Sequence, residues 1–329
     1  VIIKRKGRLD GGGARGKNGA ELRHGRGGRQ VAQELIDVEG IRVIIGAISS
    51  PVTLAIAPIC EENEVILFSP SSSAPGISQA GEYIYRNYPS DILEGTSMAK
   101  FARDLGLERL AIFALDNEFG AGLKEVFTAQ YESKYREVVM ACDFKDGLTD
   151  CFPDDVKKVK DLDPDGIYII AYVNDLARLL TLIHEAGIEA VLMGSGSVTE
   201  DLIRLAGPAA ENLVYPQPSF DVDSRNPAVA SFVDSYRAKY HEDPDIYAAH
   251  GYDALKLLAV AIESCGSAHP DDIRIGFSSI KNYEGAAGRT AFDENGDVVR
   301  YPRMFIIRNG KSMPYETFVE EGGSLLQGS

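Results

Sequence analysis

Short apolar runs recur along the chain, and most are continuous instead of alternating with polar residues. The clearest occupy residues 43–46, 65–69, 110–115 and 166–172. A continuous run is typical of a strand covered by helices on both faces, as in a parallel sheet. Segments with apolar residues at helical spacing, such as residues 174–186, separate the runs. The alternation predicts an α/β fold with doubly wound parallel sheets.

The same pattern assigns elements along most of the chain. Strands are predicted at residues 43–46, 65–69, 83–88, 110–115, 137–142, 166–172, 190–193 and 304–308, and helices at 30–38, from 51 onward, 91–105, 119–131, 153–159, 174–186, 198–205, 227–240, 247–264 and 271–280. The Asn295-Gly296 pair predicts a hairpin turn between residues 290–292 and 298–299. Pro216 and Pro218 interrupt the rhythm and predict a crossing between two domains.

Residues 43–75 are predicted to form one βαβ unit with serines after each strand. Ser49 and Ser50 follow the first strand, and Ser71, Ser72 and Ser73 follow the second. Ser50 suits the N-cap of the helix that Pro51 begins. Ligands of parallel sheets bind beyond the carboxyl ends of strands, and a helix N-terminus favours an anion, so this corner predicts a site for a small carboxylate. The alternative is that these serines only cap the helix and turn the chain.

Length and charge narrow the classes of function. With 329 residues the chain is long enough for two domains, and its net charge of −15 argues against nucleic acid as a partner and favours a soluble monomer. No apolar run approaches the roughly 18–20 residues of a membrane span, and no signal peptide is recognisable. These features fit either the mature form of an exported protein or a cytosolic one.

The first 30 residues differ from the rest in composition. They hold nine of the 34 Lys and Arg residues, two of the 49 acidic residues and nine glycines. Residues 11–16 formally match a dinucleotide-binding glycine pattern, but no buried strand precedes them, so we reject that motif. Because glycines and charges bury little apolar surface, we expect residues 1–29 to add little to the core.

The sequence offers no recognisable catalytic or metal-binding pattern. The four cysteines lack metal-type spacing, although Cys142 and Cys151 could pair, and the five histidines are scattered. Ser195 lies in a Gly-Ser-Gly-Ser run without the frame of a nucleophile elbow. We therefore expect no enzyme activity, no cofactor and no metal.

Several motifs taken together resemble the type I periplasmic solute-binding proteins of branched-chain amino acid ABC transporters. These motifs are VIIG at 43–46 with Ser49-Ser50, API at 57–59, FSPSSSAP at 68–75, DNEFG at 116–120, AGI at 186–188, GYDA at 251–254 and FDENGD at 292–297. They occur in the order of the family and span residues 30–310. The family also begins with a strand and a Thr-Gly ligand loop that cannot be found in residues 1–29.

The resemblance implies two discontinuous lobes joined by three crossovers, with the ligand held in the cleft and hinge closure of the lobes over it, as in a Venus flytrap. One lobe would comprise residues 1–89 and 219–301, and the other residues 90–218 and 302–329.

The resemblance also implies roles for individual residues. The serine matching Ser50 binds the ligand carboxylate, the position matching Ser71 offers its carbonyl to the ligand ammonium, and Ser73 stands where a threonine hydroxyl helps. Tyr172 matches an aromatic residue of the opposite lobe that closes on the ligand.

Two positions depart from the best-known pattern of the family. Phe119 stands in place of a tyrosine, and Gly196, between Ser195 and Ser197, stands in place of the glutamate that pairs with the ligand ammonium. The ligand is therefore expected to be either an amino acid held with help from an acid elsewhere or an apolar or aromatic carboxylate without an ammonium.

By this resemblance the chain is an extracytoplasmic, periplasmic protein that delivers its ligand to an ABC permease. The alternative is a sensor of the same fold that binds a small amide or carboxylate. Neighbouring genes for a permease and an ATPase would favour transport, and a regulator or amidase operon would favour sensing.

Overall fold

The computed structural model describes residues 25–148 and 152–326. The chain divides into two compact units. Unit 1 comprises the described residues up to Ser90 together with Pro218–Arg300, and unit 2 comprises Asp91–Gln217 together with the described residues from Tyr301 onward. The chain passes between the units three times.

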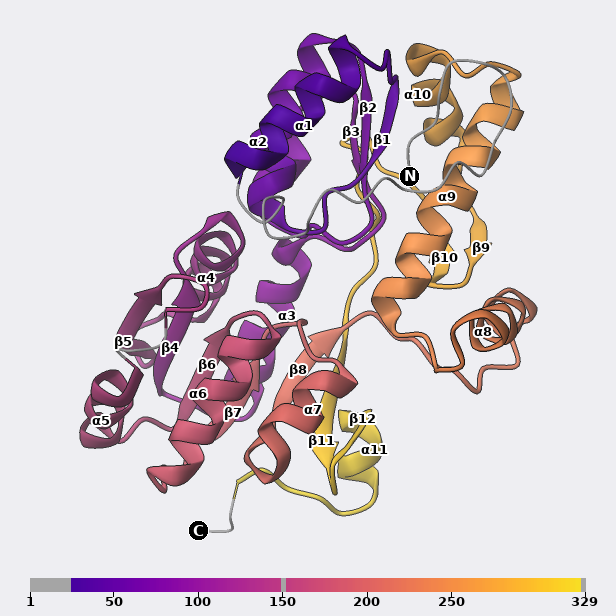
Figure 1. Ribbon diagram of the computed structural model, residues 1–329. Coiled ribbons are helices and arrows are strands. Elements are labelled where there is room, and N and C mark those ends of the chain that lie inside the picture. The colour runs from indigo at the N-terminus through magenta and orange to yellow at the C-terminus, as the bar shows by residue number, and fades with distance from the viewer. Residues whose placement is uncertain (1–24, 149–151, 327–329) are drawn as a thin grey trace. The chain divides into compact units, whose positions relative to one another are not determined.

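Unit 1 is built on a parallel three-stranded sheet in the order β1-β2-β3 (Figure 1). Its strands are β1 (Val43–Ile45), β2 (Ile66–Ser69) and β3 (Ile84–Arg86), and a separate antiparallel hairpin holds β9 (Tyr283–Gly285) and β10 (Gly288–Thr290). Its helices are α1 (Gly25–Asp37), α2 (Ser50–Glu62), the short 3₁₀ helix η2 (Pro75–Gln79), α8 (Pro227–Tyr240), α9 (Ile246–Cys265) and α10 (Pro270–Ser279).

Helices cover both faces of the sheet of unit 1. Side chains of a strand alternate between its faces. On β2, Leu67 packs with α1 and α2, whereas Ile66 and Phe68 pack with α9 and α10. This arrangement explains why the β2 sequence is apolar throughout.

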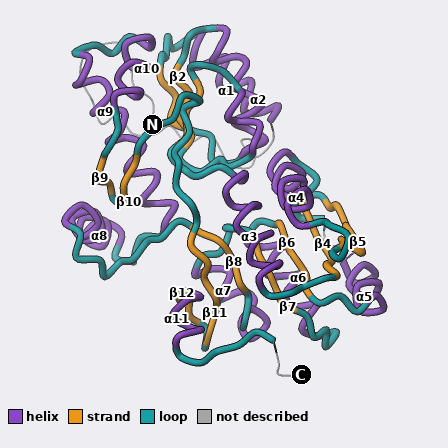
Figure 2. Tube along the Cα trace, turned by 180° about the vertical axis from the view of Figure 1, so that it is seen from behind, coloured by secondary structure: helices purple, strands orange, loops and turns teal. Residues whose placement is uncertain are grey.

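Unit 2 contains a seven-stranded sheet in the order β12-β11-β8-β7-β6-β4-β5, drawn in orange in Figure 2. Its strands are β4 (Arg109–Leu115), β5 (Glu137–Phe144), β6 (Gly166–Ile170), β7 (Val191–Gly194), β8 (Val214–Gln217), β11 (Arg303–Arg308) and β12 (Lys311–Pro314). Its helices are α3 (Asp91–Asp104), α4 (Glu118–Tyr131), α5 (Phe152–Leu162), α6 (Val173–Glu185), α7 (Glu200–Ala206), the 3₁₀ helix η3 (Gly207–Ala210) and α11 (Tyr315–Glu320). The β4–β8 strands are parallel, and β6 is buried along its whole length.

The predicted fold class is confirmed, with three local corrections. The sheet of unit 2 is not wholly parallel, because β11 and β12 run antiparallel at its edge. The predicted turn at Gly296 has only a single bridge beside it, between Phe292 and Val298, while the β9–β10 hairpin just before it was not predicted.

The third correction concerns the start of the described chain. Helix α1 begins at Gly25, five residues before the predicted start, and Gly28 is buried against Val52 of α2. Of residues 25–29 only Gly28 is buried. The prediction for residues 1–24 lies outside the described residues, and so does the Cys151 half of the possible disulfide. The thiol of Cys142 donates to the Asp155 carboxylate.

Candidate functional site

Two loops of unit 1 bring the predicted serines together, one after β1 and one after β2. The structure corrects the role of Ser50: the N-cap of α2 is Ser49, and its side chain makes no capping bond. Instead, the Ser50 Oγ accepts from the backbone amides of Ser73 (3.2 Å) and Ala74 (3.1 Å). Because a hydroxyl that accepts two hydrogen bonds still has its proton to donate, Ser50 remains a donor at the N-terminus of α2.

Ser72 has a structural role in joining the same two loops. Its fully buried hydroxyl bonds the Thr53 hydroxyl at 2.7 Å and donates to the carbonyls of Ala47 and Ile48. The Ser69 hydroxyl also donates to Ala47 and accepts from the amides of Ser71 and Ser72. Ser72 is therefore removed from the proposed anion donors of unit 1.

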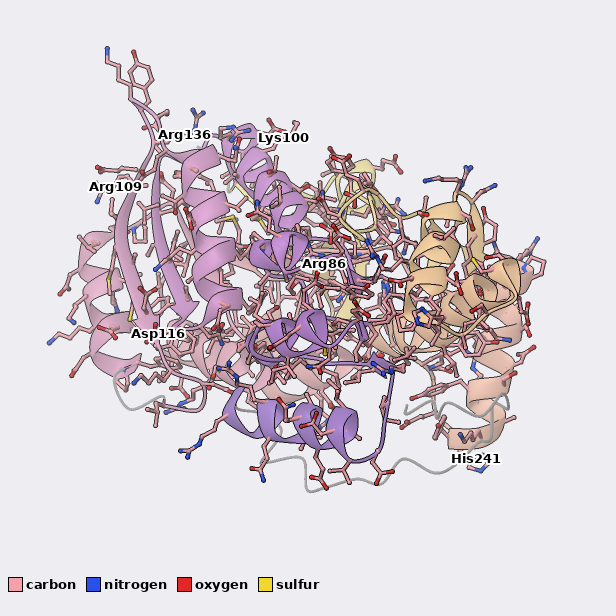
Figure 3. The ribbon with its side chains drawn as sticks, turned by 90° about the horizontal axis from the view of Figure 1, so that it is seen from above. Arg86, Lys100, Arg109, Asp116, Arg136 and His241 are labelled. Carbon is pink, nitrogen blue, oxygen red and sulfur yellow. The ribbon has the colours of Figure 1, made fainter. Side chains whose placement is uncertain are left out.

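A buried arginine fixes the loop after β2 that carries Ser71, Ser72 and Ser73, here called the serine loop. All five N–H groups of Arg86 are used: two donate to the Asp297 carboxylate (2.6 and 2.8 Å), two to the carbonyls of Ser73 (2.8 Å) and Ala74 (2.9 Å), and one to the Ser78 hydroxyl. Figure 3 shows Arg86 among packed side chains, whereas His241, at the end of α8, lies on the outside. The two residues whose amides bind Ser50 thus have their carbonyls fixed by Arg86.

In unit 2 the predicted residues follow three neighbouring parallel strands, β4, β6 and β7. Phe119 lies in the first turn of α4 and stacks on Tyr172, the N-cap of α6, with ring centroids 5.5 Å apart and an interplanar angle of 9°. Burial, followed by the charge of Asp146, raises the pKa of Tyr172 to about 12, so its phenol stays neutral at ordinary pH.

Hydrogen bonds to α3, to β8 and to the residue that follows β6 fix the loop after β7. The Ser195 hydroxyl is buried and donates to the Ala171 carbonyl, so we do not retain it as a ligand contact. The Gly196 amide donates to the Glu94 carboxylate at 2.9 Å, and its carbonyl accepts from the Gln217 side chain. Glu94 and Gln217 were missed by the sequence analysis, as were Arg86, Ser69 and Thr53.

Comparison with known proteins identifies the family of the chain. A family model described as periplasmic binding protein matches residues 25–311. The chain belongs to the periplasmic binding protein family.

Relatives place this periplasmic binding protein among the type I members of the branched-chain amino acid branch. The leucine-, isoleucine-, valine-, threonine- and alanine-binding protein of Pseudomonas aeruginosa is 25% identical over 275 residues, which cover 82% of this chain and 72% of that protein. The solved leucine-binding protein of Thermotoga maritima is 30% identical with a TM-score of 0.83, over 88% of this chain and 83% of the other. A Rhodopseudomonas palustris solute-binding protein solved with benzoate is 20% identical with a TM-score of 0.80, over 88% and 81%, and shows the shared fold alone.

The family consists of solute-binding proteins and not of enzymes, in agreement with the sequence analysis. Within residues 25–148 and 152–326, no cluster of three or more His, Cys, Asp or Glu side chains could hold a metal ion. No helix in this part of the chain has the length and apolar character needed to span a membrane.

Proposed function

We propose that this periplasmic binding protein is the extracytoplasmic solute receptor of an ABC transporter, and that it binds an amino acid or a similar small carboxylate. The Ser50 hydroxyl carries the proposal. It stands at the N-terminus of α2, fixed by the amides of Ser73 and Ala74, with its proton available for an acceptor. A hydroxyl donor and the positive end of a helix dipole together favour a carboxylate.

The apolar end of the ligand is assigned to the stacked rings of Phe119 and Tyr172 in unit 2. Aromatic rings offer large apolar area with defined geometry, which suits aliphatic and aromatic side chains alike. The names of the Pseudomonas and Thermotoga relatives support a branched-chain amino acid, and a permease is the partner that such a receptor requires. A monomer of 35.7 kDa is part of the proposal and is measured by light scattering on a sizing column.

Calorimetry tests the carboxylate assignment. Leucine, phenylalanine, 4-methylpentanoate, 3-phenylpropanoate and benzoate are titrated into the wild type and into Ser73→Ala. A hydrogen bond to a charged group contributes about 1.5–3 kcal/mol, so Ser73→Ala should weaken binding by about 10- to 100-fold. Ser235→Ala, on the exposed side of α8, is the control and should bind as the wild type does. Binding of sugars or nucleotides in place of every carboxylate would refute the assignment.

A further inference from the structure

An α-amino acid brings an ammonium group whose burial is costly without an anionic partner. In the family pattern that partner is a glutamate at the position of Gly196, which has no side chain to offer. The serine loop of unit 1 has no carboxylate, and its Ser73 and Ala74 carbonyls already accept from Arg86, so the Ser71 carbonyl alone would leave the ammonium without an anionic partner. An acid from another element is needed.

Glu94 of α3 lies directly against Gly196. Its Oε1 accepts the Gly196 amide at 2.9 Å, and the residue is 7% exposed. Asp91 begins the same helix, is 1% exposed and lies three residues earlier, so both carboxyl groups are on one face of α3. One buried acid thus contacts the loop where the family carries its own acid, and a second buried acid lies beside it on α3.

A second observation, the buried hydroxyl of Tyr168, concerns the surroundings of the same two acids. The Tyr168 hydroxyl, on β6, is fully buried and has no hydrogen-bond partner among the residues that the structure describes. Burial, and after it the charges of Glu94 and Asp91, raise the pKa of Tyr168 well above its usual value, so the phenol is close to both acids. Asp91 also acts on Tyr172, one of the proposed ligand contacts. This buried phenol without a hydrogen-bond partner in the described part of the chain, which is affected by the charges of both acids, is a group that a polar ligand group would satisfy.

We propose that Glu94 supplies the carboxylate that pairs with the ammonium of an α-amino acid ligand, in place of the side chain absent at Gly196. This inference rests on the proposed function and deepens it, because it selects amino acids over carboxylates that lack an ammonium. Glu94 is therefore the residue that determines ligand class in unit 2.

The surroundings of Glu94 couple ligand binding to the release of a proton from this residue. Burial and the neighbouring Asp91 raise the pKa of Glu94, and only the Gly196 amide opposes them. The Tyr168 phenol of β6 is a further titratable group affected by these charges, and the apolar Leu123 and Val126 of α4 pack against the adjacent Gly95. A raised pKa means that Glu94 holds a proton more readily than an exposed glutamate does, whereas an arriving ammonium favours its ionised form. Binding an amino acid therefore lowers the proton occupancy of Glu94 and releases the difference to the buffer.

Titration of the wild type in buffers of different ionisation enthalpy tests this coupling without any variant. At pH 7, leucine or phenylalanine should release up to about one proton per molecule bound. The matched acids 4-methylpentanoate and 3-phenylpropanoate should bind more weakly and release none.

The Glu94→Gln variant tests the residue itself. Its amide oxygen can still accept from the Gly196 amide, so the loop keeps its support, while the charge is removed. Amino acid affinity should fall by about 10- to 100-fold and the proton release should vanish, whereas the matched acids should lose little. Asp104→Asn, at the exposed end of the same helix, should bind as the wild type does.

The outcomes separate this inference from the proposed function. Equal weakening of amino acids and matched acids by Glu94→Gln would show that Glu94 only positions the Gly196 loop, and unchanged amino acid binding would refute the inference alone. A wild type that binds only carboxylates without an ammonium would also overturn the inference and leave the carboxylate site standing. A wild type that binds neither class would remove the proposed function as well.

Discussion

Replacing Asp297 by Asn should destabilise unit 1 far more than the loss of an ordinary surface ion pair. Arg86 is fully buried, and the side chain of Asp297 is 11% exposed, so water contributes little to neutralising the guanidinium. Removing one partner of a buried pair leaves an uncompensated charge and costs about 3–5 kcal/mol. We expect a loss of this size in the free energy of unfolding.

The assay is urea unfolding at pH 7 followed by circular dichroism, with Asp201→Asn as the matched control. Asp201 pairs with Arg204 at 2.9 Å, but both side chains are about 70% exposed. Such pairs contribute about 0–1 kcal/mol, so this control should unfold nearly as the wild type does. An Asp297→Asn variant no less stable than Asp201→Asn would refute the reasoning.

The same substitution should also weaken ligand binding. Arg86 holds the carbonyls of Ser73 and Ala74, and the amides of these two residues hold Ser50. A loosened guanidinium therefore relaxes the proposed carboxylate donor. Affinity for leucine should fall in Asp297→Asn under conditions where the protein is still folded, and Asp201→Asn should leave it unchanged.

The remaining predictions concern stability. Gly251→Ala should stabilise the protein by about 0.5–1 kcal/mol, because this glycine lies within α9 with open space where a Cβ would stand. In Gly276→Ala a methyl group would collide with the Ala261 carbonyl, so urea unfolding should show a loss; equal effects of the two substitutions would contradict this. Burial, followed by the charge of Arg300, lowers the pKa of His250 to about 3, whereas the unfolded chain protonates near 6.5. The unfolded state therefore binds the additional proton, and stability should fall by about 1.4 kcal/mol per pH unit between about pH 6 and pH 3. Unfolding at pH 7, 5.5 and 4 should show a shallower decline for His250→Leu, and identical slopes would contradict it.

Periodicity carried most of the fold prediction. The run at residues 166–172 became β6, which is buried on every residue as a strand between two helical layers must be. The edges were harder to predict. The last strand was predicted at residues 304–308, but the short, partly exposed strand β12 follows it after the Asn309-Gly310 turn, and the weak apolar pattern of β12 gave no signal.

The site was harder to predict than the fold because its decisive contacts are long-range. A serine before a helix usually caps it, yet the Ser50 hydroxyl binds amides 23 and 24 residues further on, and Ser49 takes the cap position. Glu94 and Gly196 lie 102 residues apart, and Arg86 and Asp297 lie 211 apart. No local pattern encodes such pairs, whereas the serine clusters were visible because each directly follows a strand.

The stacked rings of Phe119 and Tyr172 have a practical consequence for spectroscopy. The chain contains no tryptophan, so it has no indole fluorescence of its own. Tyr172 is only partly buried and its ring lies flat on its neighbour, so an indole at this position replaces one planar ring by another. In Tyr172→Trp every photon of indole emission would come from the aromatic wall of unit 2. Binding of a ligand to the proposed contacts in unit 2 could then be followed by fluorescence in real time, including for ligands whose heat of binding is close to zero.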